Sequence, residues 1–314
     1  MKILITGSRG FIGGSFGRYV ARLGHEVIGT GRGAAINDDW PGRYIQTDLS
    51  PAYFAEIVSE FKPDVLLHAA GSASVAASIT DPMSDLHAAA GTCANVLEGV
   101  RRAGVRPLIL IPSSAAVYGN PETLPVNEDA SAQPISPYGF HKAVCELLAR
   151  EYAECFGLDI IVCRFFSVFG LAQRRLLVWE LYKQLAGGEN AAWLEGTGAE
   201  SRDFLHIDDV NTALLGLSEH RAPDQSGKHT VVNVGSGIET SVTLVAEQLR
   251  DLVAPQKEIR CRGVIRKNDP RRWCADISRL RAYLPSWQPG SLRERLALCV
   301  ESWQQHAPLS QHGS

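Results

Sequence analysis

The sequence predicts an α/β fold: a doubly wound parallel sheet followed by a smaller C-terminal α/β domain. Short apolar runs alternate with helical patterns in the first half of the chain, and strands buried on both faces between such helices are typical of parallel sheets. A glycine-rich turn directly follows the first run, and the alternation becomes irregular after about residue 170. We therefore expect a large sheet domain over 1–167, to which the chain returns at about 206–236. The smaller domain takes most of 168–314.

The elements of the first domain follow one another regularly. Helices are expected near 11–23, 51–61, 83–103 and 137–156. The runs predicted to form strands are KILIT, EVIGT, RYIQT, DVLLHAA, PLILIPSS and DIIVCRFF. Because connections between parallel strands are right-handed, this order limits the fold to the doubly wound class.

The second half has its own elements. LLVWELYKQLAGG predicts a helix that ends at two glycines, and AAWLEGTGAESRDFLHIDDV predicts a strand, a turn and the start of a helix. VVNVGSG predicts a further strand, and helices are expected near 241–253, 278–284 and 291–304.

Composition argues against several classes of protein. The chain has 314 residues, of which 45% are hydrophobic, so it can bury a sizeable core. Its formal net charge of -3 gives no electrostatic case for binding nucleic acid or an anionic membrane. No apolar run is long enough to span a bilayer. The seven cysteines and nine histidines show neither CxxC nor HExxH spacing. We therefore expect a cytoplasmic protein with scattered thiols and no bound metal.

The glycine-rich turn has the spacing of a phosphate-binding loop. In GSRGFIG, Gly7, Gly10 and Gly13 lie between the first predicted strand and the first helix. Glycine permits a tight turn and close backbone approach, and the helix N-terminus directs N–H groups and a partial positive charge at a pyrophosphate. In this context the spacing predicts dinucleotide binding, as in Rossmann folds.

A second motif places a phenol and an ammonium one helical turn apart. In SPYGFHKAVCE, Tyr138 precedes Lys142 by four residues, so both share a helix face. A fixed positive charge beside a phenol favours its ionised form, which suits a proton donor or acceptor. Hydride transfer to a carbonyl builds negative charge on oxygen, and such an acid with a hydroxyl donor stabilises it. The alternative is an ordinary amphipathic helix with a surface lysine.

Together, these motifs resemble the extended short-chain dehydrogenase/reductase family. Its members include NAD(P)-dependent nucleotide-sugar epimerases, dehydratases, decarboxylases and reductases. LLHAAG, PSSAAVYG and RFFSVFG are similar to the family's fourth-, fifth- and sixth-strand motifs, and SRDFLHIDDV is similar to its substrate-domain motif. The resemblance extends over nearly the whole chain.

The resemblance implies a catalytic set of Ser114, Tyr138 and Lys142. Tyr138 would exchange a proton with a sugar hydroxyl or carbonyl, Lys142 would bind the nicotinamide ribose, and Ser114 would hydrogen-bond the same substrate oxygen. Ser113 competes for the serine's role, but Ser114 directly precedes AAVYG, the family position. The alternative for Ser114 is a cap at the end of a strand.

The resemblance also implies binding residues. For the cofactor these are Gly7, Arg9, Gly10, Phe11, Ile12, Gly13, Arg32, Asp48, Leu49, Ala69, Ala70, Gly71, Tyr138, Lys142 and Phe165. For a nucleotide-sugar substrate they are Ser113, Ser114, Ser167, Arg202, Arg266 and Asp269. Two guanidinium groups suit a diphosphate because each makes bidentate, charge-assisted bonds, although either arginine could be a solvated surface residue. Arg271 and Arg272 are expected to be surface charges.

Four positions depart from the family pattern. Ala88 and Ser167 stand where many relatives carry asparagine. Ala115 and Ala116 stand where dehydratases carry an Asp-Glu pair, and a methyl group cannot move a proton, so we expect no loss of water. The nearest carboxylates in sequence are expected to be solvated loop charges, with the alternative that one folds back over the site: Glu122, Glu128 and Asp129.

The end of the second strand bears on cofactor choice. NAD-preferring relatives place a carboxylate there, which binds the adenosine ribose and repels a 2′-phosphate. This chain has Gly31 followed by Arg32, which can pair with that phosphate. We expect NADP(H) to be favoured, with NAD(H) possible if Arg32 points into solvent.

These observations favour NADPH-dependent reduction of a 4-keto nucleotide sugar. The alternative is a nucleotide-sugar 4-epimerase that works through a transient 4-keto intermediate. A more remote alternative is a non-catalytic dinucleotide-binding sensor, which has no need of Ser114, Tyr138 and Lys142 together. The resemblance also implies a homodimer that pairs the helices near 83–103 and 137–156.

Overall fold

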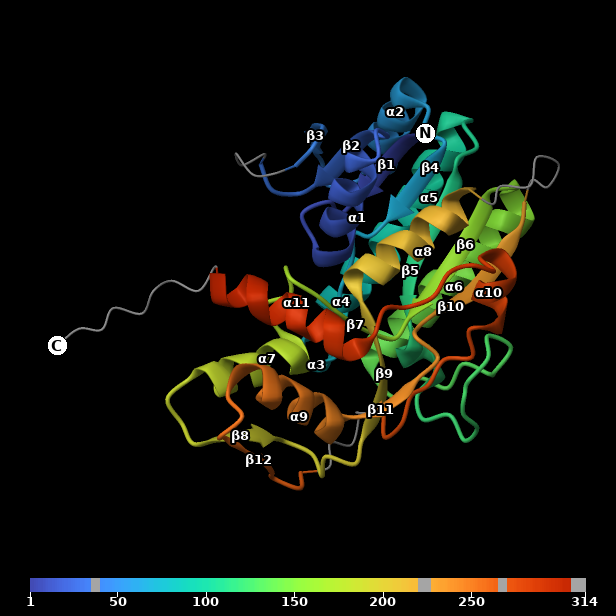
Figure 1. The fold of residues 1–314 in the computed structure, drawn as a ribbon. Coiled ribbons are helices and arrows are strands. Elements are labelled where there is room, and N and C mark those ends of the chain that lie inside the picture. The colour runs from blue at the N-terminus through green and yellow to red at the C-terminus, as the bar shows by residue number, and fades with distance from the viewer. Residues whose placement is uncertain (35–39, 220–226, 265–269, 306–314) are drawn as a thin grey trace.

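The computed structural model describes residues 1–34, 40–219, 227–264 and 270–305. A seven-stranded parallel sheet lies at its centre, in the order β10-β6-β5-β4-β1-β2-β3 (Figure 1). Its strands are β1 (Lys2–Thr6), β2 (Glu26–Gly31), β3 (Arg43–Gln46), β4 (Val65–His68), β5 (Leu108–Ser114), β6 (Asp159–Phe165) and β10 (His229–Val234). The order reverses between β1 and β4, and the carboxyl ends of strands at such a switch point are where ligands bind.

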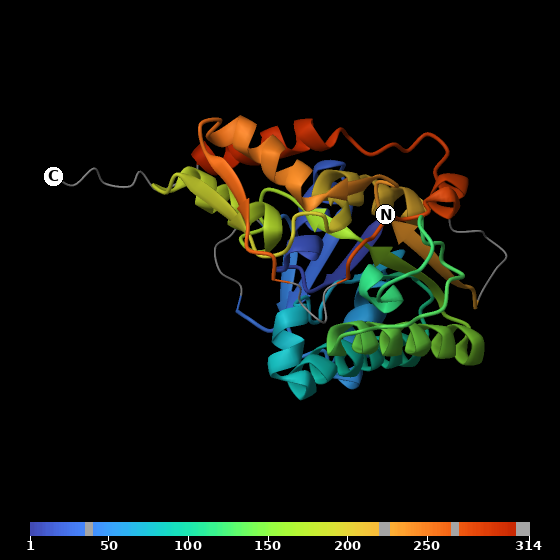
Figure 2. The ribbon, with the colours of Figure 1, turned by 90° about the horizontal axis from the view of Figure 1, so that it is seen from below.

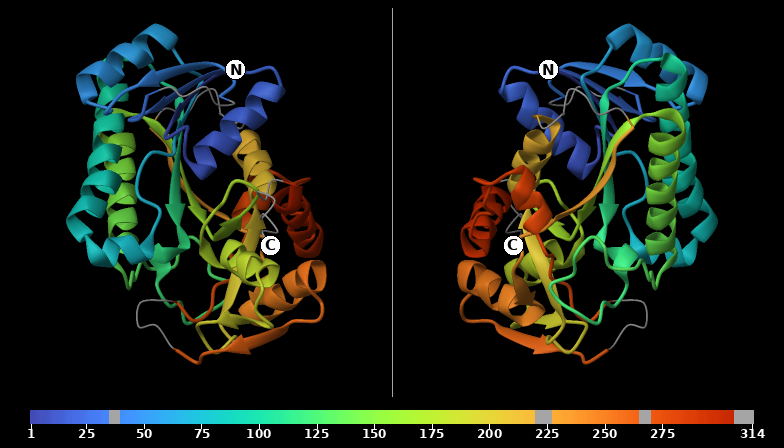
Figure 3. Two further views of the ribbon diagram at one scale, coloured as in Figure 1. Left: turned by 90° about the vertical axis from the view of Figure 1, so that its left-hand side faces the viewer. Right: turned by 90° about the vertical axis from the view of Figure 1, so that its right-hand side faces the viewer.

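Helices cover both faces of this sheet (Figure 3). α1 (Phe11–Arg22) and α8 (Ile207–Glu219) lie on one face, and α2 (Pro51–Phe61), α5 (Thr92–Ala103) and α6 (Pro137–Phe156) lie on the other. Side chains alternate along β1: Ile3 and Ile5 join the first core and Leu4 joins the second. The predicted doubly wound parallel sheet is therefore confirmed.

The connection between β4 and β5 is more divided than the sequence suggested. Instead of one helix near 83–103, it contains α3 (Val75–Thr80), α4 (Pro82–Leu86), a π-helical turn η1 (His87–Gly91) and α5. Figure 2 shows these segments beside α6 on one face of the sheet.

The C-terminal half builds a second layer beyond the carboxyl ends of the sheet strands (Figures 1 and 3). β11 (Glu239–Ser241), β9 (Ser201–His206) and β7 (Ser167–Phe169) form a three-stranded sheet, and β8 (Ala191–Leu194) pairs with β12 (Glu258–Cys261). Three helices pack here in a separate core: α7 (Leu176–Ala186), α9 (Val242–Val253) and α11 (Leu292–Gln305). The short α10 (Ser278–Tyr283) packs against β10.

The chain re-enters the large sheet through α8, which packs on α1, and β10, which pairs with β6. We propose the division into 1–167, with the return at about 206–236, and a smaller domain in the remainder. In the described ranges, no helix combines the length and apolar character that a membrane span requires.

Candidate active site

The glycine loop packs tightly against the end of β4. Gly7 has a φ of +66°, and a Cβ there would lie 2.6 Å from both the Ala69 oxygen and the Ala70 nitrogen. A Cβ on Gly13 would lie 2.6 Å from the Gly7 oxygen. Gly10 precedes α1 and supplies no side-chain cap, so the N–H groups of the first turn remain directed out of the helix. The loop thus offers the backbone donors and positive dipole end that suit a phosphate.

Further features of the strand ends fit a dinucleotide. Ala70 donates its N–H to Thr6 Oγ1 at 3.2 Å, and Gly71 has a φ of +148°. Leu49 adopts a left-handed φ of +64° in the turn after β3. At the end of β2, Thr30 is fully buried, and its hydroxyl has no hydrogen-bond partner among the residues that the structure describes. An unpaired buried hydroxyl beside a glycine-lined loop is a place where a ligand can supply the missing bond.

The remaining cofactor candidates are dispersed around these strand ends. Phe165 is buried at the end of β6, and Phe11 and Ile12 form the first turn of α1. The Asp48 carboxylate accepts the Ser50 N–H at 3.0 Å. Arg32 is exposed directly after β2.

Tyr138 and Lys142 lie on one face of α6, as predicted. Ser136 caps this helix by accepting the Gly139 N–H at 3.2 Å, and proline at its first position suits the helix start. The Lys142 ammonium lies 5.7 Å from the Tyr138 ring centroid and donates to the Pro112 oxygen at 3.0 Å. The lysine is therefore held between the tyrosine and the end of β5.

The two competing serines have different surroundings. Ser113 is buried and its Oγ donates to Glu146 Oε1 at 2.5 Å. Ser114 caps the 3-10 turn η2 (Ala115–Tyr118), where its Oγ accepts the Ala116 N–H at 3.2 Å. This cap, the alternative weighed for Ser114, uses only the oxygen and leaves the hydroxyl proton for a substrate oxygen. The engagement of Ser113 with Glu146 favours Ser114 as the substrate-facing serine.

The turn capped by Ser114 lies against the start of α6. A Cβ on Gly139 would lie 2.6 Å from the Ala116 oxygen, so only glycine permits this approach. The fold thus brings Ser114 and Tyr138, which are 24 positions apart in the chain, into neighbouring elements.

His68 was not among the predicted site residues. It is buried at the end of β4, and its Nδ1 lies 2.8 Å from Thr6 Oγ1. Burial, and then the charge of Lys142, lower the pKa of His68 to about 3, so the imidazole is neutral. A polar residue inside the otherwise apolar run VLLHAA, at 65–70, was the available signal.

Two of the substrate-side candidates, Arg202 and Ser167, lie on the second layer. Arg202, on β9, donates to the Ser201 oxygen at 2.8 Å, and its guanidinium carbon lies 5.4 Å from the Trp273 ring centroid. Ser167 begins β7. Arg266 and Asp269 fall outside the described residues. Arg271 and Arg272, which the sequence predicted to be surface charges, are both exposed.

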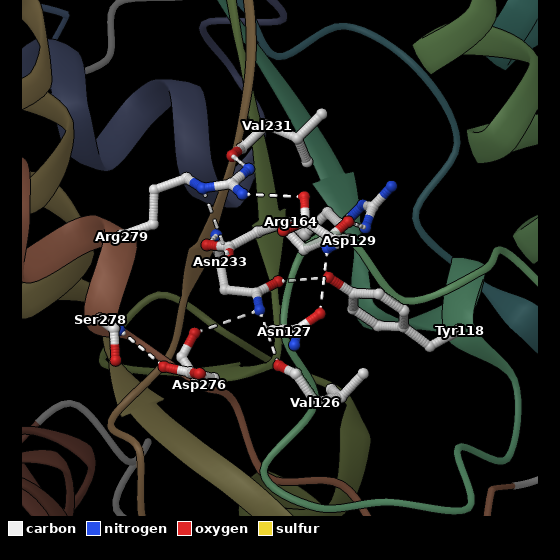
Figure 4. A network of polar contacts seen from close by, with 11 residues as sticks. Tyr118, Val126, Asn127, Asp129, Arg164, Val231, Asn233, Asp276, Ser278 and Arg279 are labelled. Carbon is white, nitrogen blue, oxygen red and sulfur yellow. Dashed lines mark hydrogen bonds and ion pairs between the residues drawn. The ribbon is translucent and has the colours of Figure 1, made fainter.

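A buried polar network supports the loop that follows η2 (Figure 4). Tyr118 donates to Asn233 Oδ1 at 2.7 Å, and the Asn233 amide donates to the Val126 oxygen at 2.9 Å and the Asp276 oxygen at 3.2 Å. The guanidinium of Arg164 lies 4.6 Å from the Tyr118 ring centroid. Burial raises the pKa of Tyr118 to about 12. This tyrosine therefore stays protonated and serves the fold.

The expectation that all three loop carboxylates are solvated was wrong for Glu128. Its side chain is 4% exposed, and Oε1 accepts the Asn233 N–H at 2.8 Å. Asp129 is exposed and pairs with Arg279 at 2.9 Å, and Glu122 is exposed. A carboxylate held inside this network is not free to replace the acid–base pair of a dehydratase.

The chain is similar to known proteins over most of its length. A sequence model described as the NAD dependent epimerase/dehydratase family matches residues 3–235. The UDP-glucose 4-epimerase of Mycolicibacterium smegmatis is 30% identical, over 96% of this chain and 98% of that protein. The UDP-glucose 4-epimerase of Corynebacterium glutamicum is 30% identical over 80% of each chain.

Solved structures are similar over almost the entire chain. MoeE5 in complex with UDP-glucose and NAD has a TM-score of 0.86 and 26% identity, covering 97% of this chain and 99% of that one. The UDP-glucose 4-epimerase of Thermotoga maritima, with UDP-glucose, has a TM-score of 0.86 and 27% identity over the same shares. TunA, an NAD-dependent NDP-hexosamine 5,6-dehydratase, has a TM-score of 0.85 and 27% identity, covering 97% and 98%.

Proposed function

We infer a function from one premise: the chain belongs to the NAD-dependent epimerase/dehydratase family. We propose that it is a nucleotide-sugar 4-epimerase acting on a UDP-hexose. Support comes from relatives named UDP-glucose 4-epimerase and from the structural neighbours that hold UDP-glucose. The observation that carries the proposal is the placement of Lys142 between Tyr138 and the strand end that bears Ser114.

The proposed chemistry removes one hydride and one proton at C4 and then returns both, with the hydride delivered to the opposite face of the sugar so that C4 inverts. NAD, when bound, supplies the hydride acceptor and donor. Tyr138 takes the proton from the C4 hydroxyl and gives it back to the oxygen of the 4-keto sugar. Ser114 donates a hydrogen bond to that oxygen, and the Lys142 charge stabilises the phenolate between the two steps. Atoms balance because the sugar differs only in the configuration at C4.

This proposal reverses the order suggested by the sequence, which placed net 4-keto reduction first. The named relatives favour the alternative, and the neighbouring complex contains NAD. We keep reduction as a second candidate because of the turn after β2. Its three successive carbonyls accept hydrogen bonds from Gln46 (3.0 Å), Tyr44 (2.7 Å) and Arg9 (2.9 Å). These three hydrogen bonds fix the backbone that carries Arg32. The guanidinium of Arg32 suits a 2′-phosphate, which NADPH carries and NADH lacks.

Two further parts of the proposal concern substrate and assembly. We propose that Arg202 and Arg266 bind the substrate diphosphate. We also propose a homodimer through α6, where the exposed residues Phe140, Val144 and Leu147 recur at helical spacing. In sedimentation, Leu147→Glu should give a single-chain mass while Leu298→Glu, an exposed control on α11, should not. A wild-type mass of one chain at micromolar concentration would exclude the dimer.

The test of function compares two reactions of the purified protein. We expect interconversion of UDP-glucose and UDP-galactose without net use of NAD(P)H. Tyr138→Phe should lower turnover by at least about 10²-fold with a nearly unchanged dinucleotide Kd, because the phenol moves the proton. Tyr53→Phe, an exposed control, should match wild type. Stoichiometric oxidation of NADPH by a 4-keto nucleotide sugar without epimerisation would establish the reductase instead.

A further inference from the structure

A nearly buried carboxylate lies between the loop after β4 and the helix that carries Tyr138. Asp85, on α4, is 5% exposed. Its Oδ1 accepts a hydrogen bond from Ser72 Oγ, and its Oδ2 lies 2.5 Å from His141 Nδ1. The His141 side chain is only 13% exposed. Because a buried carboxylate is costly unless donors satisfy it, both contacts hold their segments firmly to Asp85.

Each partner of Asp85 belongs to a segment of the candidate site. Ser72 directly follows Gly71, in the loop whose residues Ala69 and Ala70 abut the glycine loop. His141 directly precedes Lys142 on α6. One carboxylate therefore connects the cofactor side of the site to the helix of the proposed acid–base pair.

The connection that contains α3 and α4 contacts α6 at a second point. Ser78, on α3, is fully buried, accepts the Tyr138 N–H at 3.0 Å and donates to the Val75 oxygen at 2.7 Å. α3 and α4 thus bind α6 at Tyr138 through its backbone and at His141 through its side chain. Two attachment points three residues apart fix both the position and the rotation of this helical turn.

The direction of the bonds decides what kind of cluster this is. Ser72 donates to Asp85 and not to the imidazole, so the serine is not activated as a nucleophile. With Ser72 donating to Oδ1, the contact of Oδ2 with His141 Nδ1 is a hydrogen bond in the imidazole tautomer that carries its proton on Nδ1. The hydrogen bonds of Asp85 therefore hold the loop after β4 and α6 together.

We propose that His141 and Asp85 are positioning residues for the proposed 4-epimerase reaction. They set the spacing between the loop after β4, which contacts the dinucleotide, and Tyr138 with Lys142. The inference rests on the proposed function for its turnover readout, but its binding readout does not. Because small displacements of reacting groups cost up to about 10²-fold in rate, loss of the His141 contact should act on kcat and on dinucleotide affinity. The KM for the nucleotide sugar should change little, because Arg202 lies on β9, away from this contact.

The test uses three variants of the full-length protein. His141→Phe keeps a ring and removes the donor, and His141→Asn restores an N–H donor to Asp85. His87→Phe makes the same chemical change at an exposed histidine on η1. We expect His141→Phe to lower kcat about 10- to 100-fold and to weaken dinucleotide binding several-fold, with a sugar KM within about twofold of wild type. His141→Asn should recover most of both losses, and His87→Phe should behave as wild type.

The outcomes separate this inference from the function on which it builds. The dinucleotide Kd is measured without turnover, so an unchanged Kd in His141→Phe overturns the inference even if the enzyme proves to be a reductase. If wild type epimerises and His141→Phe keeps its kcat, only the inference fails. If His141→Asn remains as impaired as His141→Phe while both show wild-type melting temperatures, the donor to Asp85 is not what matters.

Discussion

Replacing Gly7 by alanine isolates what the close packing of the glycine loop contributes. The φ of +66° at Gly7 is a left-handed conformation that costs an alanine about 1–2 kcal/mol. Gly104, which follows α5, has a φ of +67°, and a Cβ there would have no heavy atom within 4 Å. Gly104→Ala therefore meets the same backbone cost in open space, and it is the matched control.

The two positions differ in what the new methyl group meets. At Gly7 the methyl would lie 2.6 Å from backbone atoms of Ala69 and Ala70, which cannot rotate away as a side chain can. Relieving such an overlap costs roughly 1–3 kcal/mol more. We expect a loss of unfolding free energy of about 1–2 kcal/mol for Gly104→Ala and about 2–5 kcal/mol for Gly7→Ala.

The assay is urea unfolding of both variants together with titration of NAD and NADP. Gly7→Ala should weaken dinucleotide binding at least about tenfold, a change of about 1.4 kcal/mol, because the loop must move away from β4. Gly104→Ala should leave the Kd unchanged. Equal stability losses in the two variants, or an unchanged Kd in Gly7→Ala, would refute the reasoning.

Three further predictions concern the cofactor, pH and the type of reaction. If Arg32 binds a 2′-phosphate, as the second candidate function requires, the Kd for NADP should be at least about tenfold lower than for NAD, and Arg32→Ala should lose that preference while the exposed control Arg22→Ala keeps it; equal wild-type values would remove this support for the reductase. Because the folded-state pKa of His68 is lowered to about 3 from 6.5, the unfolded chain binds a proton that the folded chain does not, so stability should fall as pH drops from 6.5 towards 3. His68→Asn should reduce the loss of stability between pH 6 and pH 5 by about 1.2 kcal/mol, and an unaltered loss would contradict a neutral buried imidazole. Since Ala115 and Ala116 move no proton, mass spectrometry of products from nucleotide hexoses should show no loss of water, and a dehydrated product at a substantial rate would point to another acid–base pair.

Local features of the sequence determined much of this protein. The bounds expected near 51–61 and 137–156 match α2 and α6, because proline at the first helical position and a serine before it are signals within a few residues. The spacing of Gly7, Gly10 and Gly13 and of Tyr138 and Lys142 is likewise local. These motifs indicated the fold and the family without knowledge of any long-range contact.

Only the tertiary structure decided matters that depend on partners distant in the chain. The engagement of Ser113 by Glu146, 33 residues away, distinguishes the two serines, and the burial of Glu128 depends on Asn233, 105 residues away. The contact between Asp85 and His141 joins α4 to α6 across 56 residues. Neither periodicity nor spacing specifies such pairs, because they form only where the parallel sheet brings its connecting segments together, and the same is true of the short strands β7, β11 and β12.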